Sequence, residues 1–225
     1  GGHFFIAPAN PYHSTQRYIH ETNVVETHFI NDEGEVRVTD AFTAMSEEEK
    51  AHSLFPDHEI LRVVHGIKGN VKMKMECAPR KFYGKDIPVF EDRKRLGVQF
   101  SWKENIHTLL STLEPEVMRV MHHGDDKVEA EFNVTVDKNI IFSLSYSSQS
   151  PSVIPELRFN GLKRMTNTIA FWQSWIRRCT YTGLYENEVR RSALALKLLT
   201  YAPSGAIIAA PVTSLPEEPG GERNW

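Results

Sequence analysis

Up to about Ser148, short runs of residues alternate between apolar and polar side chains, and turn residues separate the runs. In the run 71–77, valine, methionine and cysteine occupy the odd positions, and lysine or glutamate the even ones. A period of two is typical of strands that bury one face and expose the other to water. This pattern constrains the first two thirds of the chain to a mainly antiparallel β fold.

Turn residues predict how the strands connect. Asp32-Glu33-Gly34 lies between the runs 23–31 and 35–42 and predicts a hairpin. Lys68-Gly69-Asn70 separates 60–67 from 71–78 in the same way and predicts a second hairpin. Further strands are expected at 16–20, 97–102, 117–121, 127–136 and 140–146, with turns at 124–126 and 137–139. Eight or more such strands predict an antiparallel sandwich over residues 1–150.

Helical patterns are rare before Pro151 and dominate after it. Within the sandwich, Ser46 and Glu49 have the spacing of a capping box, which predicts one short helix. Beyond Pro151, with Pro155 suited to a first turn, apolar residues recur every three or four positions. They are Leu162, Met165, Ile169, Trp172 and Ile176. The segment 151–183 is therefore expected to be a linker whose amphipathic helix lies on the sandwich.

A second helix is expected from about Asn187 to Tyr201, and it is apolar around most of its circumference. A helix of this kind has to be enclosed by other elements, and one sandwich face covers only one side of it. We therefore expect further helices outside this chain, so that 184–225 would be the start of a truncated helical domain. The first residue, Gly1, directly precedes an apolar run, which suggests that the first strands of the sandwich are missing as well.

Composition excludes several classes of function. The chain is 40% hydrophobic and 24% charged, as in ordinary soluble globular proteins. Its net charge is −3 without a basic stripe, so no nucleic-acid partner is expected. No apolar run approaches the roughly 20 residues of a membrane span, so no membrane partner is expected. Cys77 and Cys179 are too few for a disulfide framework, and reduced thiols favour a cytoplasmic location.

The last part of the chain carries a family resemblance. It comprises Arg191-Ser192-Ala193-Leu194, the run 198–203, Gly205-Ala206-Ile207, Ala209-Ala210-Pro211, 213–217, Gly220-Gly221 and Arg223-Asn224-Trp225. This series resembles the opening of the catalytic domain in glycoside hydrolase family fifteen, the glucoamylase and bacterial trehalase group. Weaker matches in the same order lie upstream, at Phe5-Ile6-Ala7-Pro8, Arg62-Val63-Val64, Ala78-Pro79-Arg80 and Tyr181-Thr182-Gly183. The resemblance covers essentially the whole chain.

The resemblance implies a fold and an activity. The fold would be an N-terminal super-β-sandwich, a linker helix and an (α/α) barrel that 184–225 begins. The family hydrolyses α-glucosidic bonds with inversion, using an acid and a carboxylate roughly 6.5–9.5 Å apart. In the family both glutamates lie well beyond the position of Trp225, so this chain is expected to hold no catalytic residue and to be inactive alone. Its implied partners are the rest of its barrel and an α-linked glucose saccharide, either trehalose or a short α-glucan.

The substrate-binding candidates are Arg223, Asn224 and Trp225. In family members, the segment just after this motif carries sugar-binding aromatic, arginine and aspartate residues. An aromatic face and a guanidinium fork suit a glucose ring and its hydroxyls. The same residues could equally shape the wall of the pocket without touching the sugar.

Other chemical patterns are weaker. Glu217 and Glu218 are adjacent and point apart in an extended chain, so a loop role is expected. His122-His123 lacks a third ligand at suitable spacing, and no metal is expected. No nucleophile elbow surrounds Ser204 or Ser214, and Gly220-Gly221 is not followed by the lysine of a phosphate loop. No cofactor is therefore expected.

Two other functions fit the sequence. A stand-alone β-sandwich module for carbohydrate binding or protein interaction would need a row of exposed aromatics. The available residues, which do not share one alternating strand, are Tyr12, Phe82, Tyr83, Phe90 and Trp102. A structural role is the other alternative, because open sheet edges would favour a homo-oligomer.

Overall fold

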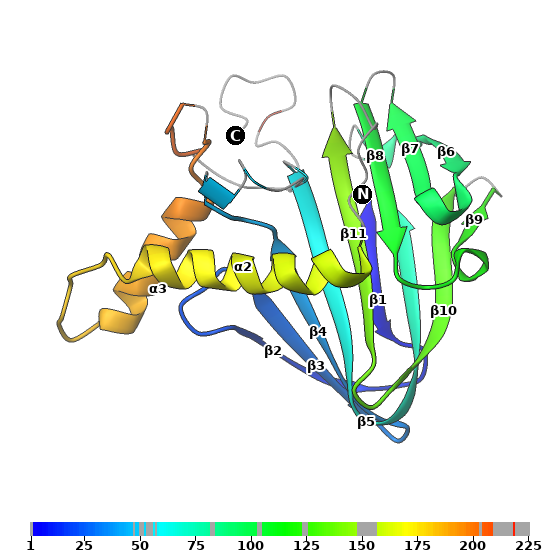
Figure 1. Ribbon diagram of the computed structural model, residues 1–225, viewed down its shortest axis with the longest axis horizontal. Helices are drawn as coiled ribbons and strands as arrows, with labels where there is room; N and C mark the ends of the chain where they lie inside the picture. Colours follow the sequence, from blue (N-terminus) through cyan, green and yellow to red (C-terminus); the bar gives the residue numbers. More distant parts are fainter. Residues whose placement is uncertain are drawn as a thin grey trace.

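The computed structural model describes residues 2–46, 48–49, 52, 56, 58–81, 84–102, 105–122, 126–147, 157–202, 204–208 and 218. It confirms a mainly antiparallel β fold followed by a short helical part (Figure 1). The strands are β1 (His3–Pro8), β2 (His13–Tyr18), β3 (Val25–Asn31), β4 (Gly34–Phe42), β5 (His58–Ala78), β6 (Val89–Asp92), β7 (Val98–Trp102), β8 (Asn105–Ser111), β9 (Arg119–Met121), β10 (Lys127–Thr135) and β11 (Asn139–Ser147). The helices are η2 (Lys94–Leu96), η3 (Pro115–Val117), α2 (Arg158–Ile176) and α3 (Glu186–Leu198).

The long strand β5 belongs to both layers of the sandwich. Its first half lies between β4 and β11 in the larger sheet, whose order is β2-β3-β4-β5-β11-β8-β7-β6. Its second half pairs with β1 and β10 in the smaller sheet, and β9 follows β10. Apolar side chains from both layers meet between them, including Val36, Val64, Met73, Phe132 and Phe142. This shared interior is the main core.

The predicted hairpin at Lys68-Gly69-Asn70 is wrong, because β5 runs through these residues without reversing. Gly69 has a φ of +74°, and a Cβ atom there would lie 2.1 Å from the carbonyl oxygen of Glu33. Opposite this point, Asp137 has a φ of +60° between β10 and β11. Before Asp137, β10 pairs with the second half of β5, and after it β11 pairs with the first half. The turn residues therefore mark a bend that carries neighbouring strands together from one sheet into the other.

Other strand predictions had mixed outcomes. The hairpin around Asp32-Glu33-Gly34 is confirmed by the pairing of β3 with β4. The capping box is also confirmed, since Glu49 N donates to Ser46 Oγ at 3.2 Å and Ser46 N donates to Glu49 Oε2 at 3.0 Å. Strand β8 was not predicted. Its Leu109 enters the main core while Leu110 enters a second core under α2, so both faces are covered and the period of two is lost.

Helix α2 crosses the outer face of the larger sheet (Figure 1). Met165, Trp172 and Ile176 are buried there against sheet residues that include Leu61 and Ile141. The amphipathic helix on the sandwich is therefore confirmed, and so is most of its apolar stripe. Leu162 is the exception: it is 40% exposed, because the helix turns Gly161 and Arg164 toward the sheet at that level. The expected first-turn residue, Pro155, lies outside the described residues.

Candidate functional site

The rest of the described chain covers only a small part of helix α3. Leu194 is its buried residue and belongs to the second core. On other sides and just beyond the helix, five apolar residues expose 45–58% of their surface. These residues, which we call the α3 apolar surface, are Leu196, Leu198, Tyr201, Ile207 and Ile208. The prediction that the sandwich covers only one side of this helix is confirmed.

The turn between β2 and β3 holds α3 in place. Arg191 Nη1 donates to the carbonyl oxygen of Thr22 at 2.6 Å, and Arg191 Nη2 donates to Asn23 Oδ1. Asn23 Nδ2 in turn donates to the carbonyl oxygen of Leu194 at 2.9 Å. The guanidinium of Arg191 also lies 4.2 Å from the ring centroid of Tyr18. These four contacts, the α3 clamp, fix the helix against the sandwich edge with its apolar surface turned outward.

The predicted substrate residues Arg223, Asn224 and Trp225 lie outside the described residues, as do Glu217, Ser214 and Gly220-Gly221. Glu218 and Ser204 are described and exposed. His122 Nδ1 lies 3.3 Å from Asp126 Oδ2, while His123 is not described. Among the described residues, no group of three or more histidine, cysteine or acidic side chains could hold a metal ion.

The described aromatics do not form an exposed row. Phe90 is buried in the main core, and Trp102 packs against that core with its ring centroid 6.0 Å from that of Phe100. Tyr12 is more exposed, but its ring meets that of Phe29 edge-on. Phe82 and Tyr83 lie outside the described part of the chain. The aromatic-row form of the binding-module alternative therefore gains no support from the described members.

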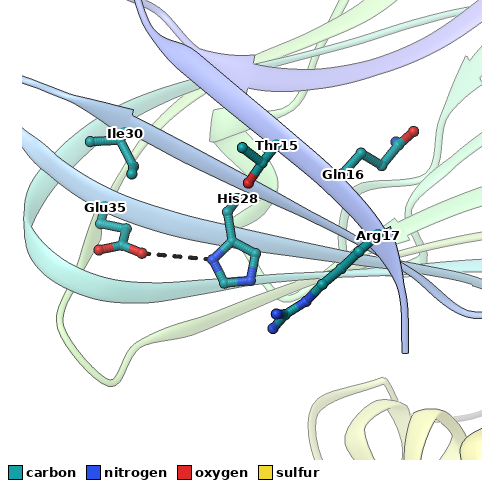
Figure 2. Close-up of a pocket in the computed structure, with 6 residues that line it drawn as sticks. All are labelled: Thr15, Gln16, Arg17, His28, Ile30 and Glu35. Atoms are coloured by element: carbon teal, nitrogen blue, oxygen red, sulfur yellow. Dashed lines mark ion pairs between the residues drawn. The ribbon is translucent and has the colours of Figure 1, made fainter. Parts of the chain in front are cut away.

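A polar pocket lies on the outer face of the larger sheet, on β2, β3 and β4 (Figure 2). This sheet-face pocket has a volume of about 260 Å³. It is lined by Thr15, Gln16, Arg17, His28, Ile30 and Glu35. The cross-strand register places Thr15 opposite His28, and Arg17 opposite Glu26 at the edge of the pocket.

Ion pairs organise this pocket. His28 Nδ1 lies 3.6 Å from Glu35 Oε1, as Figure 2 shows. Glu26 at the pocket edge receives hydrogen bonds from Arg17 Nε and Nη2 at 3.3 and 3.2 Å. The neighbouring Arg37 Nε lies 3.5 Å from Glu26 Oε1. The sequence pattern did not predict this pocket, although the alternation in β3 places Glu26 and His28 on one face of the strand.

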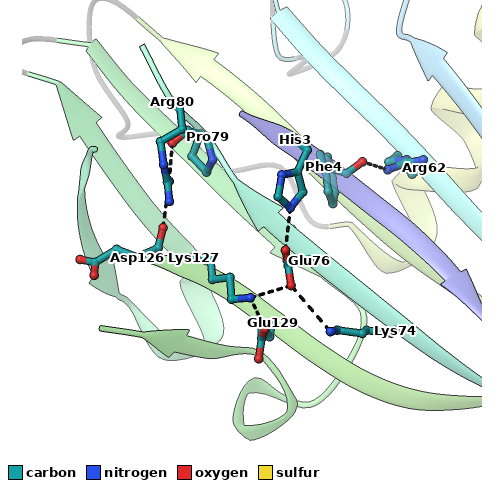
Figure 3. Close-up of polar contacts among 10 residues, drawn as sticks. All are labelled: His3, Phe4, Arg62, Lys74, Glu76, Pro79, Arg80, Asp126, Lys127 and Glu129. Atoms are coloured by element: carbon teal, nitrogen blue, oxygen red, sulfur yellow. Dashed lines mark hydrogen bonds and ion pairs between the residues drawn. The ribbon is translucent and has the colours of Figure 1, made fainter. Parts of the chain in front are cut away.

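A second charged cluster lies on the outer face of the smaller sheet (Figure 3). Glu76 accepts hydrogen bonds from Lys127 at 2.8 Å and from His3 at 2.7 Å. The bond from Lys127 is the main reason that the pKa of Glu76 falls to about 2. Glu129 and Glu76 raise the pKa of Lys127 by hydrogen bonding. The positive and negative groups of this cluster are paired with each other. We therefore interpret it as a structural ion-pair cluster and not as an acid–base site.

The two cysteines differ in accessibility. Burial raises the pKa of the Cys77 thiol to about 12, which makes it a poor nucleophile. Cys179 is only partly buried, and neither cysteine is in a disulfide. Among the described residues, no helix has the length and apolar character that crossing a membrane requires.

Comparison with known proteins finds no matching family profile. The whole chain is nevertheless similar to curated hydrolases. It is 32% identical over 229 residues to a trehalase of Thermoplasma acidophilum and 30% identical over 239 residues to a trehalase of Thermoplasma volcanium. A trehalase of Mycolicibacterium smegmatis is 29% identical over 240 residues. These trehalase relatives are consistent with a glycoside hydrolase.

These matches cover this chain completely but cover only part of each relative. All of this chain is matched, but it spans only 37%, 34% and 35% of the three relatives in the same order. Among solved structures, a putative kojibiose phosphorylase from the human microbiome is similar with a TM-score of 0.39 and 7% identity. That match covers 85% of this chain and 27% of the other.

Proposed function

We propose that this chain is the N-terminal part of a cytoplasmic trehalase-type glycoside hydrolase that cleaves α-glucosidic bonds with inversion, as in family fifteen. Residues 1–150 form the sandwich domain, 151–183 the linker, and 184–225 the start of an (α/α)-barrel catalytic domain. The carrying observation is the similarity of the entire chain to about a third of several trehalases. The two free thiols support the cytoplasmic location.

The α3 apolar surface supports this division of the chain. Five apolar residues at 45–58% exposure on one helix and the segment after it form the kind of surface that another part of a protein usually covers. In the proposed enzyme, the paired helices of the barrel pack there, and the α3 clamp sets the angle between sandwich and barrel. The sandwich then acts as a rigid support for the barrel, because Arg191 of α3 and Asn23 of the sandwich form hydrogen bonds across the contact between them.

In the proposed enzyme, Arg223, Asn224 and Trp225 lie at the sugar pocket. The indole face suits the C–H surface of a glucose ring, and the guanidinium suits its hydroxyl oxygens. The general acid and the carboxylate that activates water come from the barrel beyond Trp225. The 225-residue chain alone is therefore expected to turn over no substrate.

The test is glucose release by the product of the complete reading frame, measured with trehalose, maltose and soluble starch as separate substrates. We expect release from trehalose to exceed release from the other two. The 225-residue chain, assayed in parallel, is the matched control and should release no glucose. Failure of the complete product to hydrolyse any of the three would refute the proposal. Self-association through sheet edges stays a prediction, which sedimentation of both proteins would test.

A further inference from the structure

We propose that the sheet-face pocket is a binding site for a neutral saccharide, held through its hydroxyl groups. This inference concerns the sandwich itself and does not depend on catalysis by the proposed enzyme. Only the choice of trehalose as the first probe rests on the proposed function. Unused hydrogen-bonding capacity, balanced charges and the shape of the pocket all favour such a ligand.

The β2 side of the pocket holds polar atoms without partners among the described residues. Gln16 borders the pocket from the other face of β2, where its Nε2 donates to Thr27 Oγ1 at 3.1 Å. Arg17 uses Nε and Nη2 for Glu26, which leaves Nη1 as a donor. Thr15 Oγ1 makes no hydrogen bond in the described part of the chain. On the face that carries His28, this edge strand thus presents a hydroxyl from Thr15 and a donor from Arg17.

The opposite side of the pocket holds a histidine and a carboxylate that face each other. The 3.6 Å between His28 Nδ1 and Glu35 Oε1 is longer than a good hydrogen bond, so both atoms keep capacity for another partner. A hydroxyl group both donates and accepts, so a single ligand hydroxyl can bond to each of them. Vicinal hydroxyls of a sugar ring would satisfy such a mixed set of groups, whereas an anion could only accept.

The charges around the pocket balance. Arg17 and Arg37 are offset by Glu26, which contacts both, and by Glu35 on the far side. A balanced site gives no net attraction for an anion or a cation, and a neutral ligand rich in hydroxyls fits it better.

The size and rigidity of the pocket also suit a sugar ring. Its volume of about 260 Å³ is just below the roughly 300–1,000 Å³ of pockets that enclose drug-sized ligands. Ile30 is 52% exposed and provides an apolar surface for the C–H face of a ring. The lining residues stand on three hydrogen-bonded strands, so little ordering is needed on binding.

The experiment is an NMR titration of the 225-residue chain, labelled with ¹⁵N, with trehalose and separately with maltose. We expect saturable shifts of the backbone amides of residues 15–17, 28, 30 and 35, with a dissociation constant in the millimolar range. Thr15→Val combined with Glu35→Gln removes a hydroxyl and a charge without changing shape. This variant should weaken binding about fivefold or more, because two hydrogen bonds are lost and each counts for roughly 0.5–1.5 kcal/mol.

The matched control is Ser14→Ala, which removes a hydroxyl from the neighbouring position of β2 on the opposite face of the strand. It should bind as the unmodified chain does. Three results would overturn the inference: no saturable shifts at these amides, equal binding by the double variant, or stronger shifts with sodium sulfate than with either sugar. Hydrolysis by the complete gene product is measured separately, so failure of this site and failure of the proposed function are distinguishable.

Discussion

Removal of Arg164 should be the most damaging single change at the contact between α2 and the sandwich. Its Nη2 donates to Glu59 Oε1 at 2.8 Å, and the side chains are 6% and 0% exposed, respectively. Ser143 Oγ donates to the same carboxylate oxygen. Glu59 Oε2 and Arg164 Nη1 are also buried, and they have no hydrogen-bond partner among the described residues. The carboxylate therefore depends on Arg164 as its one cationic partner in the described structure.

The magnitude follows from the cost of a buried charge that loses its partner. Arg164→Met keeps much of the side-chain volume and leaves Glu59 with only the Ser143 hydroxyl. Breaking a buried pair in this way typically costs about 3–5 kcal/mol of unfolding free energy. The double variant Glu59→Met, Arg164→Met removes both charges, so its cost should fall to about 1–3 kcal/mol, mainly for the unpaired Ser143 hydroxyl.

The assay is urea unfolding of the chain, followed by circular dichroism, for both single variants and the double variant. The predicted result is a coupling energy of about 2 kcal/mol or more in the double-mutant cycle. In a thermal scan, Arg164→Met should melt about 6–20 °C lower, given about 2–4 °C per kcal/mol for a chain of this size. A loss below about 1 kcal/mol for Arg164→Met, or additive single effects, would refute the reasoning.

Three further predictions test other parts of the structure. The pKa of Glu76 falls from 4.5 to about 2, so the stabilising effect of its carboxylate is complete above pH 4.5 and is lost toward pH 2. Glu76→Gln should therefore flatten the decline of unfolding free energy between these pH values. An unchanged decline in the variant would contradict the stabilising role of the cluster. Iodoacetamide should modify Cys179 before the buried Cys77, as peptide mass spectrometry would show, and the reverse order would contradict the burial. Gly69→Ala should cost about 2 kcal/mol or more, and more than Gly205→Ala, where φ is +73° but no atom lies within 4 Å; equal costs in urea unfolding would contradict the bend.

The β architecture was predictable wherever a strand has one buried face and one solvent-exposed face. In the second half of β5, Val71, Met73 and Cys77 alternate with charged residues, and all three are buried as expected. Strand β8 was not predictable in this way because both of its faces are covered, so its side chains show no period of two. The bend at Gly69 was predicted as a hairpin for another reason. A positive φ serves a hairpin turn and a bend between sheets equally well, and only the pairing partners distinguish the two.

The candidate sites were also predictable only where a single segment of the chain forms them. The exposed side of α3 was predictable because it rests on local composition, seen in Leu196 and Leu198. The sheet-face pocket was not found, because Arg17, His28 and Glu35 come from three strands and look like ordinary solvent-facing residues when each strand is read alone. The sugar-binding role of Arg223 and Trp225 stays a prediction, since both lie outside the described residues.

The most direct measurement is proton NMR of the first sugars released from trehalose by the product of the complete reading frame. Inversion at one of the two linked carbons predicts equal initial amounts of α- and β-glucose, before the anomers interconvert. Initial release of α-glucose alone would contradict the inverting mechanism, and no release at all would contradict the assignment of this chain to a trehalase-type hydrolase.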